Sequence, residues 1–127
     1  MDYYLNPENS SNRLMEEYSI YKSLVIAFDF DDTVYDFHNK GRLYNDVIAL
    51  LKKLKSINCY LICWTGQEDM VFVSNYLNQN GIPFDAINEN PPFHQSKSKK
   101  IYANAYLDDR AGLFQVYNEL KYLTENI

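Results

Sequence analysis

Short apolar runs alternate along the chain with longer segments in which apolar residues recur at helical spacing. The run over 24–28 is short and contains Val and Ile, so it predicts a buried strand rather than a helix. A second strand is expected over 59–64, and shorter strands over 84–87 and 103–107. This alternation indicates several strands, most of them followed by a helix.

Three segments after the first strand each have one apolar face. They span about 43–57, 67–80 and 111–125. Asn80-Gly81 is typical of the end of a helix. The residues expected to face inward are Leu43, Val47, Leu50, Leu51, Leu54 and Ile57 in the first segment, Met70, Val73, Tyr76 and Leu77 in the second, and Leu113, Val116, Leu120 and Leu123 in the third.

Residues 1–22 precede the first strand and predict an N-terminal helical extension. Asn6-Pro7 is typical of an N-cap followed by proline at the first helical position. Leu14 and Tyr18 then follow at helical spacing, so we expect this helix to pack on the rest of the protein.

Strands that alternate with helices favour an α/β fold with a parallel sheet. We expect residues 23–127 to form one domain of three layers, a Rossmann-like parallel sheet with helices on both faces. Ligands bind at the carboxyl ends of the strands in such sheets. The residues that follow each strand are therefore the candidates for function.

The composition agrees with one globular domain. The chain has 127 residues, 46% of them hydrophobic and 23% charged, which is enough for one core and too few for two domains. The net charge of −5 does not favour a nucleic-acid-binding surface. No apolar run approaches the roughly 20 residues that span a membrane, and no basic segment leads into an apolar one at the start. We therefore expect no membrane partner and no signal peptide.

Cys59 and Cys63 both fall in the second predicted strand. Four residues of strand separate them by about 13 Å, which is too far for a disulfide. We expect two reduced core residues, consistent with a cytoplasmic protein.

Each predicted strand ends in an unusual polar cluster. The four clusters are Asp29, Asp31 and Asp32 after the first strand, Thr65-Gly66 after the second, the lysine-containing loop 88–100 after the third, and Asp108-Asp109 after the fourth. Because parallel strands end at the same edge of a sheet, these side chains are expected to meet there. Four clusters on one edge argue against a set of unrelated acidic turns.

This group of side chains suits phosphoryl transfer. Asp29 and Asp31 are two residues apart, so an extended chain would direct both carboxylates to the same side. Adjacent carboxylates repel, and a hard divalent cation such as Mg²⁺ offsets that cost. A Thr hydroxyl, backbone N–H groups and a Lys suit a phosphate. Such chemistry depends on positioning and charge neutralisation, and a carboxylate can also act as the nucleophile.

The stretch DFDDT at 29–33, Thr65 after a strand, a downstream lysine and DD at 108–109 resemble the haloacid dehalogenase-like (HAD) superfamily, in its small capless phosphatase branch. The resemblance covers about residues 23–124. It implies a Mg²⁺-dependent phosphatase that hydrolyses a phosphate monoester through an aspartyl-phosphate intermediate.

The resemblance also implies roles for the acidic residues. Asp29 would be the nucleophile that attacks phosphorus. Asp31 would protonate the leaving group and then deprotonate the attacking water. Asp29 and Asp108 would bind Mg²⁺ through their side chains and Asp31 through its carbonyl, with Asp109 supporting the metal directly or through water.

The remaining roles concern the phosphate. The resemblance implies that Thr65, with Gly66 beside it, binds the phosphate and that a lysine neutralises it. Lys97, Lys99 and Lys100 all lie in the expected loop, and Lys100 is favoured because it directly precedes the fourth strand region.

Several nearby residues have a structural interpretation instead. Asp32 stands where the family more often has Gly, which adopts a positive φ more readily. Arg110 is expected to anchor a loop or pair with an acid. His38 and His94 lack metal-ligand spacing; either could reach the site, but a position outside it is favoured. For Trp64, a place in the core is favoured over a platform for the substrate.

The connections leave no room for a cap domain. About ten residues separate Thr33 from the next helix, and one helix, one strand and a loop account for the chain between Thr65 and Lys97. The site should therefore be open to a small phosphate ester or to a phosphorylated macromolecule. The oligomeric state stays undetermined.

Two other classes of function remain open. The chain could be a non-catalytic HAD-like binding or regulatory module, although the intact Asp29, Asp31, Thr65 and Asp108 argue against it. It could also be a receiver-type signalling domain, which carries a phosphoacceptor Asp after a later strand. No lone Asp follows the second or third strand in that pattern. Nucleotide-cofactor folds are disfavoured because no glycine-rich phosphate motif is present.

Overall fold

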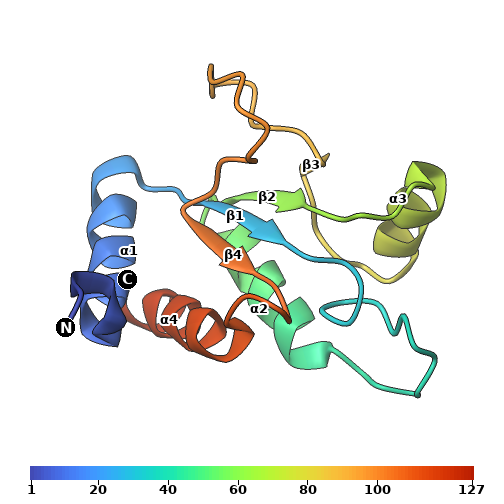
Figure 1. The fold of residues 1–127 in the computed structure, drawn as a ribbon, viewed down its shortest axis with the longest axis horizontal. Helices are drawn as coiled ribbons and strands as arrows, with labels where there is room; N and C mark the ends of the chain where they lie inside the picture. Colours follow the sequence, from blue (N-terminus) through green and yellow to red (C-terminus); the bar gives the residue numbers. More distant parts are fainter.

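The computed structural model describes all of residues 1–127, and a four-stranded parallel sheet forms its centre (Figure 1). The strands are β1 (Val25–Phe28), β2 (Tyr60–Cys63), β3 (Ala86–Ile87) and β4 (Ala105–Leu107). They lie in the order β3-β2-β1-β4, so the chain moves outward from β1 to β3 and then returns to the other side of β1. The strand order reverses between β1 and β4, which is where ligands bind in open α/β sheets.

Four α-helices and one short 3₁₀-helix complete the fold. They are η1 (Tyr3–Leu5), α1 (Pro7–Tyr21), α2 (Asn45–Ser56), α3 (Met70–Gln79) and α4 (Leu113–Asn126). The predicted start of the first helix is confirmed, because the Asn6 side chain accepts a hydrogen bond from the Glu8 N–H at 3.1 Å and Pro7 follows as the first helical residue.

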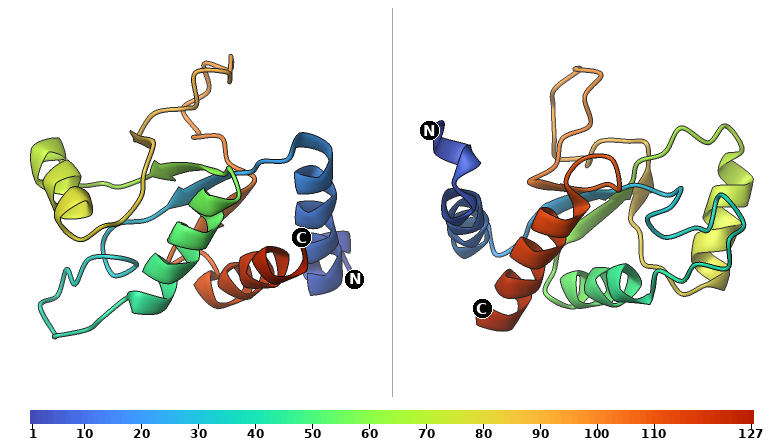
Figure 2. Two further views of the ribbon diagram at one scale, coloured as in Figure 1. Left: turned by 180° about the vertical axis from the view of Figure 1, so that it is seen from behind. Right: turned by 60° about the horizontal axis from the view of Figure 1, so that its bottom comes forward.

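One face of the sheet carries the main hydrophobic core. All four helices contribute to it, through Leu14, Leu51, Leu77 and Leu120, and the strands contribute alternate residues such as Ile26. Helices α2 and α4 lie side by side against this face, and α1 packs against α4 (Figures 1 and 2). Because Leu14 is almost fully buried here, α1 is part of the same packed unit as the sheet.

The opposite face is covered by an extended segment and not by a helix. Val25, Ala27, Ile62 and Ile101 form a separate small core there, and Ile101 belongs to the 88–104 connection between β3 and β4. The expected α/β fold with a parallel sheet and without a cap domain is confirmed, whereas the expectation of helices on both faces is not met. The connection is polar and contains two prolines, which disfavour an amphipathic helix.

Helix α2 begins later than the apolar pattern predicts. Leu43 was expected to face inward but precedes the helix, and 79% of its surface is exposed. The Asp36 carboxylate accepts hydrogen bonds from the backbone N–H groups of Lys40, Gly41 and Arg42. These bonds hold the preceding loop in a turn and delay the start of the helix.

Side chains also shorten the other elements. Asp69 caps α3 by accepting a hydrogen bond from the Phe72 N–H at 3.0 Å, so residues 65–68 stay in a loop. The Asp85 carboxylate accepts from the Leu61 N–H at 2.8 Å, and the Asn104 side chain accepts from the Val25 N–H at 2.6 Å. Side-chain oxygens therefore replace backbone carbonyls beside β3 and β4, and both strands are shorter than expected.

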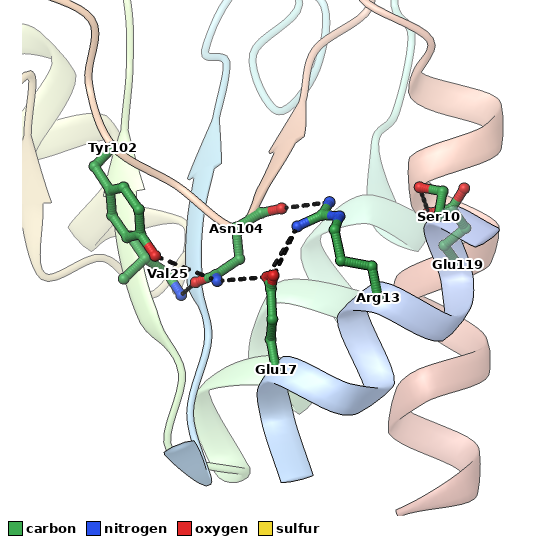
Figure 3. A network of polar contacts seen from close by, with 7 residues as sticks. All are labelled: Ser10, Arg13, Glu17, Val25, Tyr102, Asn104 and Glu119. Carbon is green, nitrogen blue, oxygen red and sulfur yellow. Dashed lines mark hydrogen bonds and ion pairs between the residues drawn. The ribbon is translucent and has the colours of Figure 1, made fainter. Parts of the chain in front are cut away.

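A polar network joins α1 to the β4 side of the sheet (Figure 3). Arg13 Nη2 donates to the Asn104 carbonyl at 3.0 Å, and Asn104 Nδ2 donates to Glu17 Oε1 at 2.9 Å. Ser10 Oγ donates to the buried Glu119 of α4 at 2.8 Å. Since β4 is an edge strand, these contacts help to cover an edge that would otherwise expose unpaired backbone groups.

None of the helices combines the length and the apolar character that crossing a membrane requires.

Candidate active site

Three carboxylates from two distant parts of the sequence converge at the carboxyl edge of the sheet. Asp29 directly follows β1, and Asp108 and Asp109 directly follow β4. The Asp29 N–H donates to the Leu107 carbonyl at 2.8 Å, which continues the β1–β4 pairing to the edge. Each of the three aspartates offers one carboxylate oxygen, and these atoms lie within 4.8 Å of one another. The cluster lies where the strand order reverses.

Thr33 connects the two halves of this cluster. Its side chain is fully buried, and its hydroxyl donates to Asp29 Oδ2 at 3.2 Å. The Thr33 hydroxyl oxygen also accepts a hydrogen bond from the Asp109 N–H at 3.2 Å. Thr33 therefore fixes the position of the Asp29 carboxylate relative to the β4 loop.

The electrostatics of the cluster are unfavourable without a cation. Partial burial raises the pKa of Asp29 from 3.8 to about 7, and the contact with Asp109 and the charges of Asp108 and Asp109 add to this rise. The hydrogen bond from Thr33 acts in the opposite direction. The three side chains together would therefore be stabilised by a bound positive charge.

Asp31 lies beside this cluster but is not part of it. The strand ends at Phe28, so the expected extended alternation does not continue to Asp31. The Asp31 backbone instead pairs with Tyr35, and its carboxylate accepts a hydrogen bond from Gln67 Nε2 at 2.9 Å. Asp29 and Asp31 nevertheless line the same cavity.

Thr65 is held at the end of β2 by its neighbours. Thr65 is buried, and its Oγ1 accepts a hydrogen bond from the Gln67 N–H at 3.1 Å. Because that oxygen is already an acceptor, its own O–H remains able to donate to a ligand. Asn88 also holds the Thr65 backbone through two hydrogen bonds of 2.8 Å each. Gly66 is exposed, and an added Cβ would meet no atom within 4 Å.

The carboxylates face a cavity of about 340 Å³. Its lining consists of Asp29, Asp31, Asp32, Phe37, His38, Asp108, Asp109 and Arg110. Phe37 and His38 come from the 34–44 loop, whose turn Asp36 stabilises. No folded cap covers the cavity.

His38 lies in this cavity, contrary to the expectation that both histidines lie outside the site. Its Nδ1 is 2.6 Å from Asp32 Oδ2, and the Tyr44 hydroxyl donates to Asp32 Oδ1 at 3.2 Å. Asp32 has a φ of +56°, a left-handed conformation that Gly adopts more readily than other residues. His94, as expected, lies elsewhere and stacks on Tyr102 with 4.6 Å between ring centroids.

Arg110 was expected to anchor a loop or to pair with an acid, and the structure places it in the lining of the same cavity. The hydrogen bond that it makes to an acid comes from its backbone N–H, which donates to Asp108 Oδ1 at 2.9 Å.

Lys100 and Trp64 lie in a groove next to the acidic cavity. Lys100 Nζ is 5.7 Å from the centroid of the Tyr106 ring, and Lys100 and Asp108 line the same groove. Lys97 and Lys99 are exposed and line none of the larger cavities. The expectation that Trp64 lies in the core is wrong, because 39% of its surface is exposed.

Sequence reasoning missed three positioning residues. Thr33 belongs to the DFDDT stretch but received no role, and Gln67 and Asn88 were assigned to a helix and a loop. Asn88 is the first residue after β3, so its position at a strand end was the signal that could have identified it. For Gln67, only the observed contacts with Asp31 and Thr65 indicate a role.

Comparisons with known proteins support the fold and name no activity. No protein-family model matches the chain, and no curated protein does. A solved structure from Bacteroides thetaiotaomicron, described as a conserved protein, has a TM-score of 0.62 and 27% sequence identity with this chain. The match covers 79% of this chain and 91% of the Bacteroides protein. The chain is thus an α/β protein with an acidic site at the switch point of its sheet.

Proposed function

We propose that this protein is a Mg²⁺-dependent, HAD-like phosphatase that hydrolyses a phosphate monoester through an aspartyl-phosphate on Asp29. The observation that carries this proposal is the convergence of the Asp29, Asp108 and Asp109 carboxylate oxygens within 4.8 Å of one another. Asp29 is about 80 positions away from Asp108 and Asp109 in the sequence, so the fold itself brings the acids together.

The donor set fits a hard divalent cation. Carboxylate oxygens are the ligands that Mg²⁺ prefers, and Mg²⁺ sites in proteins often use only one or two of them together with water and phosphate. The raised pKa of Asp29, about 7, reflects burial and the neighbouring negative charges, which a cation would offset. Asp29 and Asp108 would hold the ion through their side chains, Asp31 through its carbonyl, and Asp109 directly or through water. When bound, Mg²⁺ would neutralise negative charge and orient the phosphate.

The carboxylates supply the chemistry in two steps. In the first step a carboxylate oxygen of Asp29 attacks phosphorus, the bond to the ester oxygen breaks, and Asp31 gives its proton to the departing alcohol. In the second step Asp31 takes a proton from water as the water oxygen attacks phosphorus. The bond between phosphorus and Asp29 then breaks, which releases phosphate and restores both carboxyl groups.

The surrounding contacts keep these groups in position for the reaction. Thr33 holds the nucleophilic carboxylate of Asp29, and Gln67 holds Asp31 at the side of the same cavity. The free O–H of Thr65 would donate to a phosphate oxygen, and the space beside Gly66 would admit the phosphate. Lys100 would add a positive charge from the neighbouring groove. Positioning of this kind and charge neutralisation account for most catalysis of phosphoryl transfer.

The open cavity suits substrates of different sizes. No cap domain covers the carboxylates, so both a small phosphate ester and a phosphorylated macromolecule could reach Asp29. The net charge of −5 gives no general attraction for nucleic acids.

The first test is the hydrolysis of p-nitrophenyl phosphate with Mg²⁺, with a chelator and with the Asp29→Asn variant. We expect turnover that needs Mg²⁺ and is lost in Asp29→Asn. Asp46→Asn is the matched control, because Asp46 is an exposed residue of α2 outside the cavity. Turnover that persists in Asp29→Asn would exclude Asp29 as the nucleophile.

A second measurement separates an enzyme from the alternative, a non-catalytic binding or regulatory module. Beryllofluoride mimics a phosphoryl group on an aspartate. If p-nitrophenyl phosphate is not hydrolysed, Mg²⁺-dependent formation of a beryllofluoride adduct on Asp29 would indicate a competent site with a selective substrate. Mg²⁺ binding without either adduct or turnover would favour the binding module.

A further inference from the structure

Two aromatic rings form a wall beside the carboxylate cluster. Trp64 directly follows β2 and Tyr106 lies in β4, yet their ring centroids are only 5.7 Å apart. The strands β2 and β4 lie on opposite sides of β1, and Ala27 of β1 is the register partner of Tyr106. The small side chain of Ala27 leaves room for the two larger rings to meet across the central strand.

The chain around this wall holds a lysine close to it. The Tyr106 hydroxyl donates to the Ile101 carbonyl, the residue next to Lys100. Lys100 Nζ lies 5.7 Å from the centroid of the Tyr106 ring, within the distance at which a cation and an aromatic face attract each other. The ammonium group is thus kept beside the rings, and its residue is exposed to solvent.

The aromatic groove and the acidic cavity share one lining residue, Asp108. The groove has a volume of about 420 Å³, a size that suits a small organic ligand. Trp64, Lys100, Tyr106 and Asp108 line the part of it that lies at the carboxyl end of the sheet. Residues of α1 and α4, among them Arg13 and Glu119, line the rest. A molecule whose phosphate lies at the carboxylate cluster could therefore extend into the groove.

We propose that this groove binds a planar aromatic ring in the organic part of the substrate, so that the substrate class is a small nucleotide-like phosphate monoester. The exposed face of Trp64, supported by Tyr106, stacks on the ring, and Lys100 pairs with the phosphate. An exposed tryptophan face offers a surface on which a heteroaromatic ring can stack, and such stacking needs no contacts specific to one base. This inference rests on the proposed phosphatase function, and it adds the identity of the organic group.

Trp64 offers a direct measurement, because it is the one tryptophan in the chain. The Asp29→Asn protein, with Mg²⁺ present, is titrated with adenosine 5′-monophosphate, ribose 5-phosphate, adenosine and inorganic phosphate. Tryptophan fluorescence reports occupancy of the groove, and isothermal titration calorimetry gives the affinities independently. This variant is expected to bind without turnover, so the result does not depend on catalysis.

We expect adenosine 5′-monophosphate to quench Trp64 with saturation and to bind at least about tenfold more tightly than ribose 5-phosphate, the gain typical of one stacked base. Equal affinities for these two ligands would overturn the inference, as would the lack of saturable quenching by the nucleotide. If p-nitrophenyl phosphate is hydrolysed but the nucleotide has no advantage, the phosphatase function stands and the aromatic subsite fails. If the nucleotide binds preferentially without any turnover by the wild type, the subsite stands and the enzymatic function fails.

Variants identify which side chains bind the aromatic ring and which bind the phosphate. Tyr106→Leu, combined with Asp29→Asn, removes the ring and also the hydrogen bond to the Ile101 carbonyl, so it should weaken the nucleotide more than ribose 5-phosphate. Tyr106→Phe, which keeps the ring and loses only that hydrogen bond, is the matched control and should keep the preference for the nucleotide. Lys100→Ala should weaken both phosphates, whereas Lys99→Ala, in the same loop but outside the groove, should weaken neither. Because Tyr106 is partly buried, its variant is first checked by circular dichroism. Trp64→Leu removes the other ring, and calorimetry should again show weaker binding of the nucleotide and unchanged binding of ribose 5-phosphate.

Discussion

Asn88 binds the backbone of Thr65 on both sides. Its Oδ1 accepts from the Thr65 N–H and its Nδ2 donates to the Thr65 carbonyl, each at 2.8 Å. A side-chain amide thus continues the pairing of β3 with β2 by one more residue. Asn88 itself has a φ of +54°, which Asn tolerates better than most residues.

Asn88→Ala should therefore reduce both stability and activity. We expect the free energy of unfolding to fall by about 2–3 kcal/mol, from two lost hydrogen bonds and from alanine in the left-handed conformation. If Thr65 binds phosphate, kcat/KM for p-nitrophenyl phosphate should also fall. Asn88→Gly is the matched control, since it loses the same bonds without the backbone strain. Urea unfolding measures the stabilities, and a variant as stable as the wild type would show that the two bonds do not matter.

The raised pKa of Asp29 predicts how stability depends on pH without a metal. The folded pKa of about 7 lies above the ordinary value of 3.8, so between these values the folded protein keeps a proton that the unfolded chain has released. Raising the pH through this window should therefore lower the free energy of unfolding, with no further change from this group above about pH 7. The measurement is urea unfolding in chelator at several pH values between 4 and 8.

Asp29→Asn isolates this effect, because it removes the titrating group and leaves all other acids. The variant should lose the part of the decline between about pH 4 and 7 that Asp29 causes. Mg²⁺ should stabilise the wild type more at pH 8 than at pH 5, since metal binding requires deprotonated carboxylates. Identical pH profiles for the two proteins would show that the Asp29 carboxyl is not perturbed.

Asp32 has a left-handed backbone conformation and also makes side-chain contacts, and two variants separate the effects of these two features. Asp32→Ala and Asp32→Gly both lose the contacts with His38 and Tyr44, but only alanine is strained at a φ of +56°. We expect the alanine variant to be less stable than the glycine variant by about 0.5–1 kcal/mol, the left-handed penalty less the entropy that glycine adds to the unfolded chain. If the alanine variant were as stable as the glycine variant in urea unfolding, the positive φ at residue 32 would not be a source of strain.

Asn104 should contribute to the attachment of the first helix. Its side chain accepts from the N–H of the buried Val25 and donates to Glu17, while its carbonyl accepts from Arg13 (Figure 3). Asn104→Ala leaves the Val25 N–H without that acceptor, so we expect a loss of about 2–4 kcal/mol in thermal or urea unfolding.

Tyr102→Phe is the control for this network. The Tyr102 hydroxyl accepts only a long hydrogen bond of 3.4 Å from Asn104, so its removal should change stability by less than about 0.5 kcal/mol. If Asn104→Ala lost as little stability as Tyr102→Phe, the backbone N–H of Val25 would have found another acceptor.

The sequence alone predicted the strands, the helices and the edge at which the acids gather. Short apolar runs and helical patterns depend on local geometry, so residues such as Val47, Leu50 and Leu54 could be assigned to a buried face from their spacing. The placement of Asp29 and Asp108 followed from a general rule, since the ends of parallel strands meet at one edge.

The ends of the strands and helices were predicted less accurately, because hydrogen bonds from side chains determine where these elements stop. Asp36, Asp69, Asp85 and Asn104 take over backbone hydrogen bonds that the pattern would assign to strands or helices. A polar residue of this kind can cap, pair or face water, and its sequence does not show which.

The tertiary structure alone decided which side chains face the site. Trp64 followed an apolar strand and was expected in the core, but it lies at the carboxyl edge of the sheet beside Tyr106, and 39% of its surface is exposed. His38 and Asn88 lie in loops, whose course depends on contacts with distant residues such as Asp32 and Thr65. Spacing along a strand reports the direction of a side chain, whereas its surroundings depend on how the rest of the chain packs.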